Sequence, residues 1–188
     1  GAGTKEDDFI EHMFVASTHQ YILFFTDKGR CYWLKVHEVP EGGRTARGRS
    51  VVNLLDKDKD DNITAFVAVK EFREDQYLIM ATQKGTIKKT VLAAYGNVRK
   101  GGINAINLAA GDSLIEVKMT DGKNDIVIGT SHGFAIRFNE KDVRDMGRTA
   151  TGVRGVRLGK GDHVVGLLVI RNDQTTVLVV TEKGFGKR

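Results

Sequence analysis

The sequence predicts an all-β protein built from tandem units of about four strands each. Four segments share one pattern, in which a β-branched or aromatic run is followed by threonine, two residues and glycine: 21–29, 77–85, 125–133 and 176–184. Their glycines, Gly29, Gly85, Gly133 and Gly184, are 56, 48 and 51 residues apart. A second short run follows each glycine, and four strands in roughly 50 residues are typical of a β-propeller blade.

The elements follow the same order within each unit. Glycine supplies the positive φ of a tight hairpin turn, so a second strand is expected after each turn, for example at 86–90. About fifteen residues beyond the turn lies a basic, glycine-containing element, at 43–48, 99–102 and 147–152. A short strand ending in leucine is expected next, at 52–54, 106–108 and 156–158.

Another apolar run completes the pattern, at 63–69, 114–117 and 164–170, after an acidic turn. Counted from Asp8, the sequence predicts three complete units and part of a fourth, all in one domain: 8–55, 63–108, 114–158 and 164–188. The chain stops directly after a hairpin turn, so we expect it to be a fragment of that domain. Few helices are expected, apart from one helical turn at 140–143.

The composition is that of an ordinary globular protein. Of 188 residues, 40% are hydrophobic and 28% are charged, which argues against a disordered tail, a collagen-like fibre or a coiled coil. The apolar runs are strand-length, whereas a membrane-spanning helix needs about 20 apolar residues. No signal peptide opens the chain, and the lone Cys31 fits a reducing compartment. We therefore expect a cytoplasmic protein with no membrane partner.

Positive charge is in phase with the repeat. The segments from each turn to the end of the following basic element hold 21 of the 29 Lys and Arg residues and 5 of the 24 Asp and Glu residues: 28–49, 84–102, 132–160 and 183–188. If the units are equivalent, these segments form one band around the molecule. A band suits a polyanion better than a pocket does, and Lys and Arg bind nucleic acid by releasing counterions from phosphates. The sequence therefore predicts a nucleic-acid partner.

Two interpretations of the glycines beside the arginines stay open. Glycine lets backbone N–H groups approach a phosphate closely. Alternatively, these glycines only supply positive φ at the strand exits. For a single charge run the ordinary interpretation is a solvated face, although four runs in phase favour binding.

No catalytic or metal site is predicted. The segment 155–161 lacks the spacing and the hydroxyl of a phosphate-binding Walker loop. The acidic run 56–61 begins like a calcium loop, but Asp61 stands where glycine is required and Val67 where the bidentate glutamate should stand. The five histidines show no ligand-pair spacing, and Cys31 is expected to be a packing residue. The sequence thus predicts no catalytic residue, metal, cofactor or small-molecule substrate.

Four segments resemble the C-terminal domain of DNA gyrase A: 9–14 (FIEHMF), 43–48 (GRTARG), 99–103 (RKGGI) and 146–156 (MGRTATGVRGV). Elements of the GRTARG type in this order favour gyrase over its topoisomerase IV relative. The resemblance implies a β-pinwheel, a propeller-like disc of six four-stranded blades that wraps double-stranded DNA around its basic rim. It also implies a bacterial, nucleoid-associated protein that works with the rest of gyrase A and with gyrase B in ATP-dependent negative supercoiling.

The chain departs from the family in two respects. The QRRGGKG-like signature box of the first blade is absent, and 41–48 and 98–102 are its analogues in other blades. The chain also covers only part of a six-bladed domain, corresponding to its middle blades. Because the catalytic tyrosine of the family belongs to a different domain, none of Tyr21, Tyr32, Tyr77 and Tyr95 is assigned that role.

These observations together predict a non-catalytic DNA-binding and DNA-wrapping module. Matching phase gives the predicted contacts: Arg44, Arg47, Arg49, Lys88, Lys89, Arg99, Lys100, Arg137, Arg148, Arg154, Lys187 and Arg188. The alternative is a protein-interaction scaffold whose basic band meets an acidic protein surface. A hydrolytic propeller is disfavoured, because it would need carboxylates and histidine clustered near a central channel.

Overall fold

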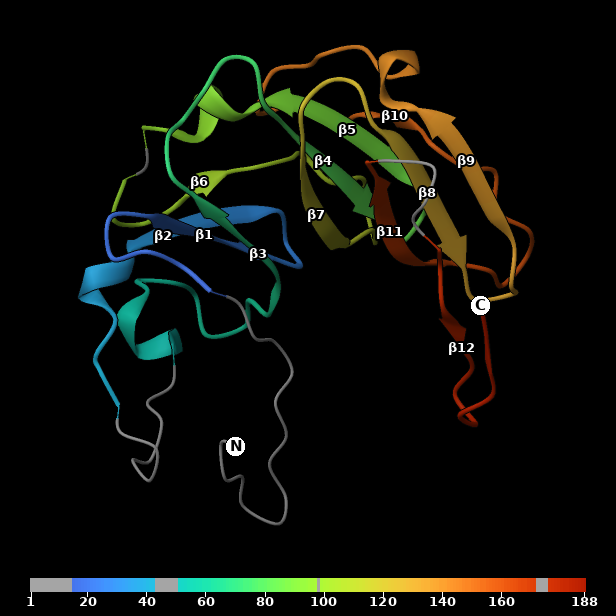
Figure 1. Ribbon diagram of the computed structural model, residues 1–188, viewed down its shortest axis with the longest axis horizontal. Coiled ribbons are helices and arrows are strands. Elements are labelled where there is room, and N and C mark those ends of the chain that lie inside the picture. The colour runs from blue at the N-terminus through green and yellow to red at the C-terminus, as the bar shows by residue number, and fades with distance from the viewer. Residues whose placement is uncertain (1–14, 43–50, 98, 172–175) are drawn as a thin grey trace.

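The computed structural model describes residues 15–42, 51–97, 99–171 and 176–188, with only the backbone of Val51 and Val52. Within these residues the protein consists of antiparallel sheets connected by loops and 3₁₀ turns, which confirms the predicted all-β class. Figure 1 shows that successive sheets follow one another along an arc, from the blue β1 to the red β11.

The first sheet combines a hairpin with strands from farther along the chain. The hairpin is formed by β1 (Tyr21–Thr26) and β2 (Arg30–Lys35). The other side of β1 pairs with β3 (Ile63–Val69), and β2 pairs with β6 (Ile103–Asn104). The strand order is therefore β3-β1-β2-β6.

The second sheet repeats this arrangement one unit later. Its central strand, β4 (Tyr77–Thr82), pairs with β5 (Thr86–Val91) and with β7 (Leu114–Thr120). The short β10 (Val153–Arg154) adds to β5, so the order β10-β5-β4-β7 matches that of the first sheet. The strand that pairs with the second strand of the hairpin, β6 in the first sheet and β10 in the second, comes from the following unit. The sheets therefore interlock neighbouring units, whose boundaries stay a prediction.

The third sheet and the last hairpin lie toward the C-terminus. The third sheet has the order β11-β8-β9 and contains β8 (Asp125–Thr130), β9 (Ala135–Asn139) and β11 (Val164–Ile170). The hairpin of the fourth unit consists of β12 (Val179–Val180) and β13 (Gly186–Lys187). Within the described residues, β9 is an edge strand of a three-stranded sheet.

The hairpin turns and the apolar runs are confirmed. Gly29, Gly85, Gly133 and Gly184 have φ angles of 79°, 88°, 83° and 79°, a region that residues with a Cβ adopt only at a cost. The three apolar runs form β3, β7 and β11, although β7 extends to Thr120 rather than residue 117.

The short strands predicted at 52–54, 106–108 and 156–158 are wrong. Residues Val51–Leu54 form a 3₁₀ turn, η2, and the other two segments belong to no strand. Their backbones bond to a turn instead of a ladder: the N–H of Ile106 donates to the Gly29 carbonyl at 3.3 Å, and that of Val156 to the Gly85 carbonyl at 3.2 Å. The strands that do pair, β6 and β10, lie just before these segments.

Short 3₁₀ turns supply the helical content. The predicted turn at 140–143 is confirmed as η4 (Glu140–Asp142), whereas η1 (Val36–Glu38) and η3 (Leu92–Tyr95) were not predicted. In the part of the chain that the structure describes, no helix is long and apolar enough to cross a membrane.

Neighbouring sheets share apolar cores. Leu23 and Phe25 of the first sheet pack in one cluster with Leu78 and Met80 of the second. A further cluster joins the second and third sheets through residues that include Ile79, Ile87, Ile126, Ile128 and Leu167. Cys31 is buried in the first cluster, as expected of a packing residue, and this burial raises the pKa of its thiol.

Candidate nucleic-acid interface

Each of the first two hairpin turns fixes the basic segment of the following unit. The Gly29 carbonyl accepts the N–H of Ala105 at 2.7 Å, and the Gly85 carbonyl accepts that of Gly155 at 2.8 Å. An added Cβ on Gly29 would lie 2.7 Å from the carbonyl oxygen of Ile106, so a larger residue cannot enter without displacing the backbone. Close packing at the turn thus places the basic loop that precedes β6 or β10.

The 99–102 loop presents two of the predicted contact residues. The N–H of Gly102 donates to the Arg99 carbonyl at 2.9 Å, and the Arg30 guanidinium donates to the Gly101 carbonyl at 2.6 Å. Arg99 and Lys100 are exposed, and no ion pair joins them to any acidic group among the described residues. A backbone held at both ends therefore carries two cations into solvent.

The two glycines of this loop, Gly101 and Gly102, fit different interpretations of why glycine occurs beside the cations. Gly102 has a φ of 74°, and an added Cβ would lie 2.6 Å from the ring of Tyr32, so glycine is required there by the backbone and by packing. Its N–H already has an acceptor. By contrast, nothing lies within 4 Å of the Cβ position of Gly101. Gly102 therefore fits the interpretation in which glycine only supplies a positive φ at the end of a strand. Of these two glycines, only Gly101 leaves the backbone beside Arg99 and Lys100 open to a close approach.

The 147–152 loop leads into β10, which carries the predicted contact residue Arg154. The N–H of Ala150 donates to the Gly147 carbonyl at 3.1 Å, and Gly152, with a φ of 103°, lies against the backbone of Ile87. Arg154 follows on β10 and is exposed. It lines a groove of about 470 Å³ together with two cationic residues outside the predicted set, Lys84 and Arg157.

Lys88 is not a surface residue, and its prediction as a DNA contact is wrong. Its side chain is 0% exposed. The ammonium donates to the carbonyls of Ala105 at 2.5 Å and Gly147 at 3.3 Å, and to that of Arg148. Burial, and secondarily the Arg148 guanidinium, lower the pKa of Lys88 to about 7.

Lys89 is also buried and neutralised, so the prediction fails there too. Its ammonium lies 3.1 Å from a carboxylate oxygen of Asp145 and 4.0 Å from one of Glu140. The ring centroid of Tyr77 is 4.5 Å away. Glu140 is itself 0% exposed and accepts hydrogen bonds from the Thr120 hydroxyl and from the N–H of Asn124, each at 2.7 Å. Lys89 thus belongs to a buried polar network between β5 and η4.

Arg137 and Arg148 are directed to protein groups. Arg137 is exposed on β9, but its guanidinium pairs with Asp125 at 2.7 Å, and hydrogen bonds from Asn139 and Arg137 lower the pKa of Asp125. Arg148 is partly buried and donates to the carbonyl of Asn104. Both guanidinium groups therefore already have partners within the protein.

The remaining predicted residues lie at the end of the chain or outside the described part. Lys187 and Arg188 are exposed at β13, and the Arg188 guanidinium donates to the Thr176 hydroxyl at 3.1 Å. Arg44, Arg47 and Arg49 fall in 43–50, outside the described residues. Whether all the basic segments form one continuous band therefore stays a prediction.

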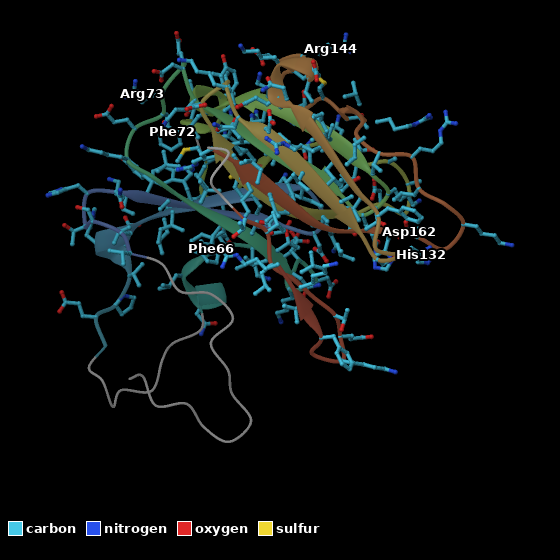
Figure 2. All side chains as sticks on the ribbon, turned by 45° about the vertical axis from the view of Figure 1, so that its right-hand side comes forward. Phe66, Phe72, Arg73, His132, Arg144 and Asp162 are labelled. Carbon is cyan, nitrogen blue, oxygen red and sulfur yellow. The ribbon has the colours of Figure 1, made fainter. Side chains whose placement is uncertain are left out.

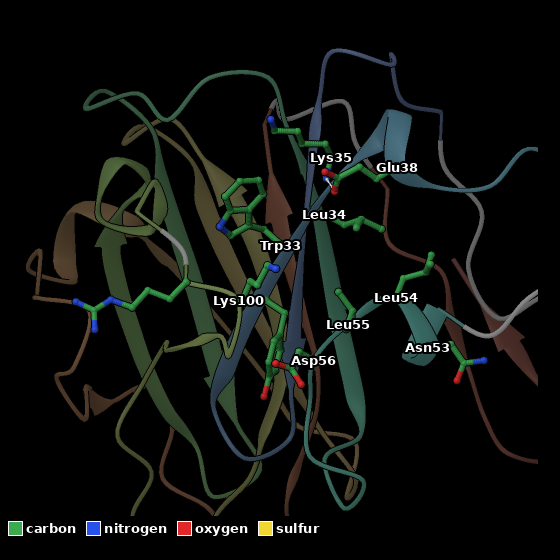
Figure 3. Close-up of a pocket in the computed structure, with 11 residues that line it drawn as sticks. Trp33, Leu34, Lys35, Glu38, Asn53, Leu54, Leu55, Asp56 and Lys100 are labelled. Atoms are coloured by element: carbon green, nitrogen blue, oxygen red, sulfur yellow. Dashed lines mark hydrogen bonds between the residues drawn. The ribbon is translucent and has the colours of Figure 1, made fainter.

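A wider groove of about 700 Å³ lies beside the 99–102 loop, lined by Arg99, Lys100 and Lys35 among others. Figure 3 shows Trp33 and Lys100 on one side of this groove and Leu54 and Asn53 on the other. Lys35 was not among the predicted contacts, although its spacing of two residues from Trp33 places both on one face of β2. This spacing in the sequence could have identified Lys35 as a residue of the groove.

The acidic turns hold the hairpin ends through hydrogen bonds and an ion pair. Asp162 accepts hydrogen bonds from the Ser131 hydroxyl at 2.8 Å and the His132 N–H at 3.0 Å, and Figure 2 shows His132 and Asp162 together. In the first sheet, buried Asp61 pairs with Lys28 at 3.3 Å. No cluster of three or more His, Cys, Asp or Glu side chains suited to a metal occurs in the described parts of the chain.

Known proteins are similar to this chain in sequence. The family model for the DNA gyrase C-terminal domain, beta-propeller, matches residues 20–69, 76–121, 124–171 and 175–188. The DNA gyrase A protein of Clostridium acetobutylicum is 55% identical over 152 residues, covering 81% of this chain and 18% of that protein. The DNA gyrase A protein of Escherichia coli K12 is 48% identical over 187 residues, covering 100% of this chain and 21% of that protein. The chain therefore spans about a fifth of the length of these relatives.

Solved structures show the same architecture. The C-terminal domain of DNA topoisomerase IV superimposes with a TM-score of 0.87 at 30% identity, covering 99% of this chain and 58% of that one. The DNA gyrase A C-terminal domain gives a TM-score of 0.76 at 23% identity, over 91% of this chain and 54% of that one, which supports the fold alone. With the family model matching most of the sequence, this chain belongs to the family of DNA gyrase C-terminal, beta-propeller domains.

Proposed function

We propose that this chain is a non-catalytic module that binds duplex DNA and bends it along the outer edge of the sheets. The observation that supports the proposal is the construction of the 99–102 loop. Its backbone is held by Arg30 and packed against Tyr32, while Arg99 and Lys100 are exposed and free of acidic partners among the described residues. A fixed backbone with unpaired cations suits a phosphate backbone, because little ordering is needed on binding.

The contacts in this proposal differ from those predicted from phase alone. Lys88 and Lys89 are excluded, because their side chains are buried. Arg137 and Arg148 are left out, because their guanidinium groups already bind Asp125 and the Asn104 carbonyl. Arg99, Lys100 and Arg154 are retained, together with Arg157 and Lys35 from the two grooves. Lys187 and Arg188 are retained at β13, and Arg44, Arg47 and Arg49 remain proposed contacts from the sequence.

Several separated contacts are needed if the duplex is bent. Smooth bending of a site of 20–30 base pairs costs about 1–6 kcal/mol. Contacts on successive loops along the arc of sheets offset that cost, whereas a single strong site would leave the flanking duplex straight. The arc of sheets in Figure 1 provides such successive positions.

The relatives support a proposal for the role of the whole protein. We propose that the chain works as part of a gyrase A protein, with the rest of that protein and gyrase B as partners, in an ATP-dependent type II topoisomerase that introduces negative supercoils. The strand-passage chemistry belongs to those other parts. A bacterial cytoplasm, with the nucleoid as the place of action, is the proposed location, and the reduced, buried Cys31 fits it.

A gel-shift titration with duplex DNA at two salt concentrations tests the proposal. The test variant reverses four charges in the candidate interface: Arg99→Glu, Lys100→Glu, Arg154→Glu and Arg157→Glu. The control makes the same charge change at four exposed lysines outside the basic segments: Lys59→Glu, Lys70→Glu, Lys118→Glu and Lys123→Glu. We expect the test variant to lose more affinity and more salt dependence than the control, since each lost phosphate contact lowers the slope by about 0.9.

Equal losses in the two variants would contradict the placement of the interface. A wild-type chain that leaves duplex DNA unshifted at low salt would contradict DNA binding itself and favour the protein-interaction scaffold. A chiral wrap of the bent duplex is measured separately, from the change in linking number when a nicked circular DNA is sealed with the chain bound. An unchanged linking number would exclude a chiral wrap and limit the function to binding or planar bending.

A further inference from the structure

A buried ammonium group lies at the junction of three successive units. Lys88, on β5 of the second sheet, donates to the Ala105 carbonyl and to the carbonyls of Gly147 and Arg148 in the 147–152 loop. The N–H of Ala105 in turn donates to the Gly29 carbonyl in the first hairpin turn. A short chain of hydrogen bonds therefore connects the first turn, the second sheet and the loop of the third unit.

We propose that Lys88 is a positioning residue, whose ammonium fixes the 147–152 loop and β10 so that Arg154 is held in place for the duplex. This inference rests on the proposed function above. The ladder that follows the loop is short, because β10 contains only two residues, Val153 and Arg154, paired with Ile87 and Thr86. A contact that grips the loop's carbonyls from inside the sheet supplements this short ladder.

The donors of the site match its acceptors. Three carbonyl oxygens face the nitrogen, and an ammonium has three N–H donors. A side chain without donors at this position leaves buried carbonyls unpaired, which costs more than an exposed unpaired group would. The Lys88 side chain therefore contributes directly to how firmly the loop is held.

The equivalent residue in the first sheet, Tyr32, also supports a basic loop, but by a different kind of contact. Tyr32 is three residues after Gly29, as Lys88 is three residues after Gly85. The Tyr32 ring lies against Gly102 in the 99–102 loop. In both sheets, this position supports the basic loop of the following unit, by ring packing in one and by hydrogen bonds to carbonyls in the other.

The surroundings allow the Lys88 ammonium to titrate near neutral pH. The Arg148 guanidinium is the charged group that acts on it, and burial together with that charge lowers the pKa to about 7. The phenol of Tyr95 donates to the same Ala105 carbonyl at 3.1 Å. Burial raises the pKa of Tyr95 and of Cys31, so both groups stay neutral in this range. Lys89, the next residue on β5, faces Glu140 and Asp145 instead.

Hydrogen exchange of the amides in 147–154 tests the positioning role without DNA. Lys88→Met removes every donor, and Lys88→Gln keeps two of them without charge. We expect exchange to become about tenfold faster in Lys88→Met, roughly the factor that one net hydrogen bond contributes, and to increase less in Lys88→Gln. Lys100→Met, which removes an exposed charge from the other loop, should leave exchange in 147–154 unchanged.

Affinity for duplex DNA, measured on the same proteins at one pH and one salt concentration, connects the loop to binding. We expect Lys88→Met to bind several-fold more weakly than the wild type, because a loosened loop no longer holds Arg154 in place, and Lys88→Gln to have intermediate affinity. Lys88→Gln keeps two donors, so it serves for the comparison if Lys88→Met does not fold.

The outcomes separate this inference from the proposed function. Unchanged exchange in a folded Lys88→Met variant overturns the positioning role. Faster exchange with the same DNA affinity as the wild type overturns the link to DNA. If the wild-type chain binds no duplex, the proposed function fails, and the exchange data still decide whether Lys88 holds the loop.

Discussion

The carbonyl of Gly85 accepts the N–H of Gly155 at 2.8 Å, which presses a hairpin turn against the backbone of the following unit. An added Cβ on Gly85 would lie 2.9 Å from the carbonyl oxygen of Val156, whereas nothing lies within 4 Å of the corresponding point on Gly133. Both glycines have positive φ, of 88° and 83°. A comparison of substitutions at these two glycines therefore separates the cost of a positive φ from the cost of a steric conflict.

Gly85→Ala should destabilise the chain more than Gly133→Ala. The left-handed conformation alone costs alanine about 1–2 kcal/mol, which is the whole expected loss at Gly133. At Gly85 the conflict with the Val156 backbone adds about 1–3 kcal/mol. Urea unfolding at equilibrium measures both, and equal losses would show that the turn can move away from the following unit.

Lys89→Met should lower the free energy of unfolding by about 3–5 kcal/mol, because it leaves the fully buried Glu140 carboxylate without its cation. Chemical denaturation of the variant measures this loss. Lys118→Met is the matched control, since Lys118 is an exposed lysine paired with Glu116 at 3.8 Å, and its loss should stay within about 0.5 kcal/mol. Similar values for the two variants would rule out a structural role for the buried pair.

Arg99→Ala should weaken binding to duplexes of every sequence to a similar degree and reduce the slope of log affinity against log salt by about one. The reason is the loss of a single phosphate contact without loss of base readout. Fluorescence anisotropy at several salt concentrations measures the slope. Arg73→Ala, which removes an exposed cation paired with Asp75 at 2.5 Å, should keep the wild-type slope. A sequence-dependent effect of Arg99→Ala would indicate base contacts instead.

The stability of the wild-type chain relative to Lys88→Met should rise with pH between about 7 and 10.5. Burial and the Arg148 charge lower the pKa of Lys88 from 10.5 to about 7 in the folded protein. Between these values the unfolded chain binds more protons than the folded one, so raising the pH favours folding. Denaturant titrations of both proteins at pH 6, 8 and 10 measure the difference, and a constant difference would contradict the lowered pKa.

Much of the fold was predictable from local pattern. Glycine at a turn and β-branched runs on either side act over a few residues, so the hairpins and the strands β3, β7 and β11 follow from the sequence. The short strands β6 and β10 were misplaced by a few residues. Their position depends on the carbonyls of Gly29 and Gly85 in a preceding unit, and this contact leaves no periodic signal in the segments themselves.

The candidate interface was predictable only in part, because adjacent cations have different environments. Arg99 and Lys100 were predicted from their phase in the repeat, and both are exposed. Lys88 and Lys89 are also two adjacent basic residues, but they are buried. Their hydrogen-bond acceptors come from segments 17 to 60 residues away. A buried lysine looks like a surface lysine until those acceptors are known.

The interlocked sheets have a consequence for how the protein is made. On the ribosome, β2 emerges more than sixty residues before β6, the strand that covers its open edge. Each nascent blade must therefore wait, with unpaired main-chain groups, for the next stretch of polypeptide, and such distant pairing slows folding. Deleting one repeat would accordingly leave its predecessor incomplete as well.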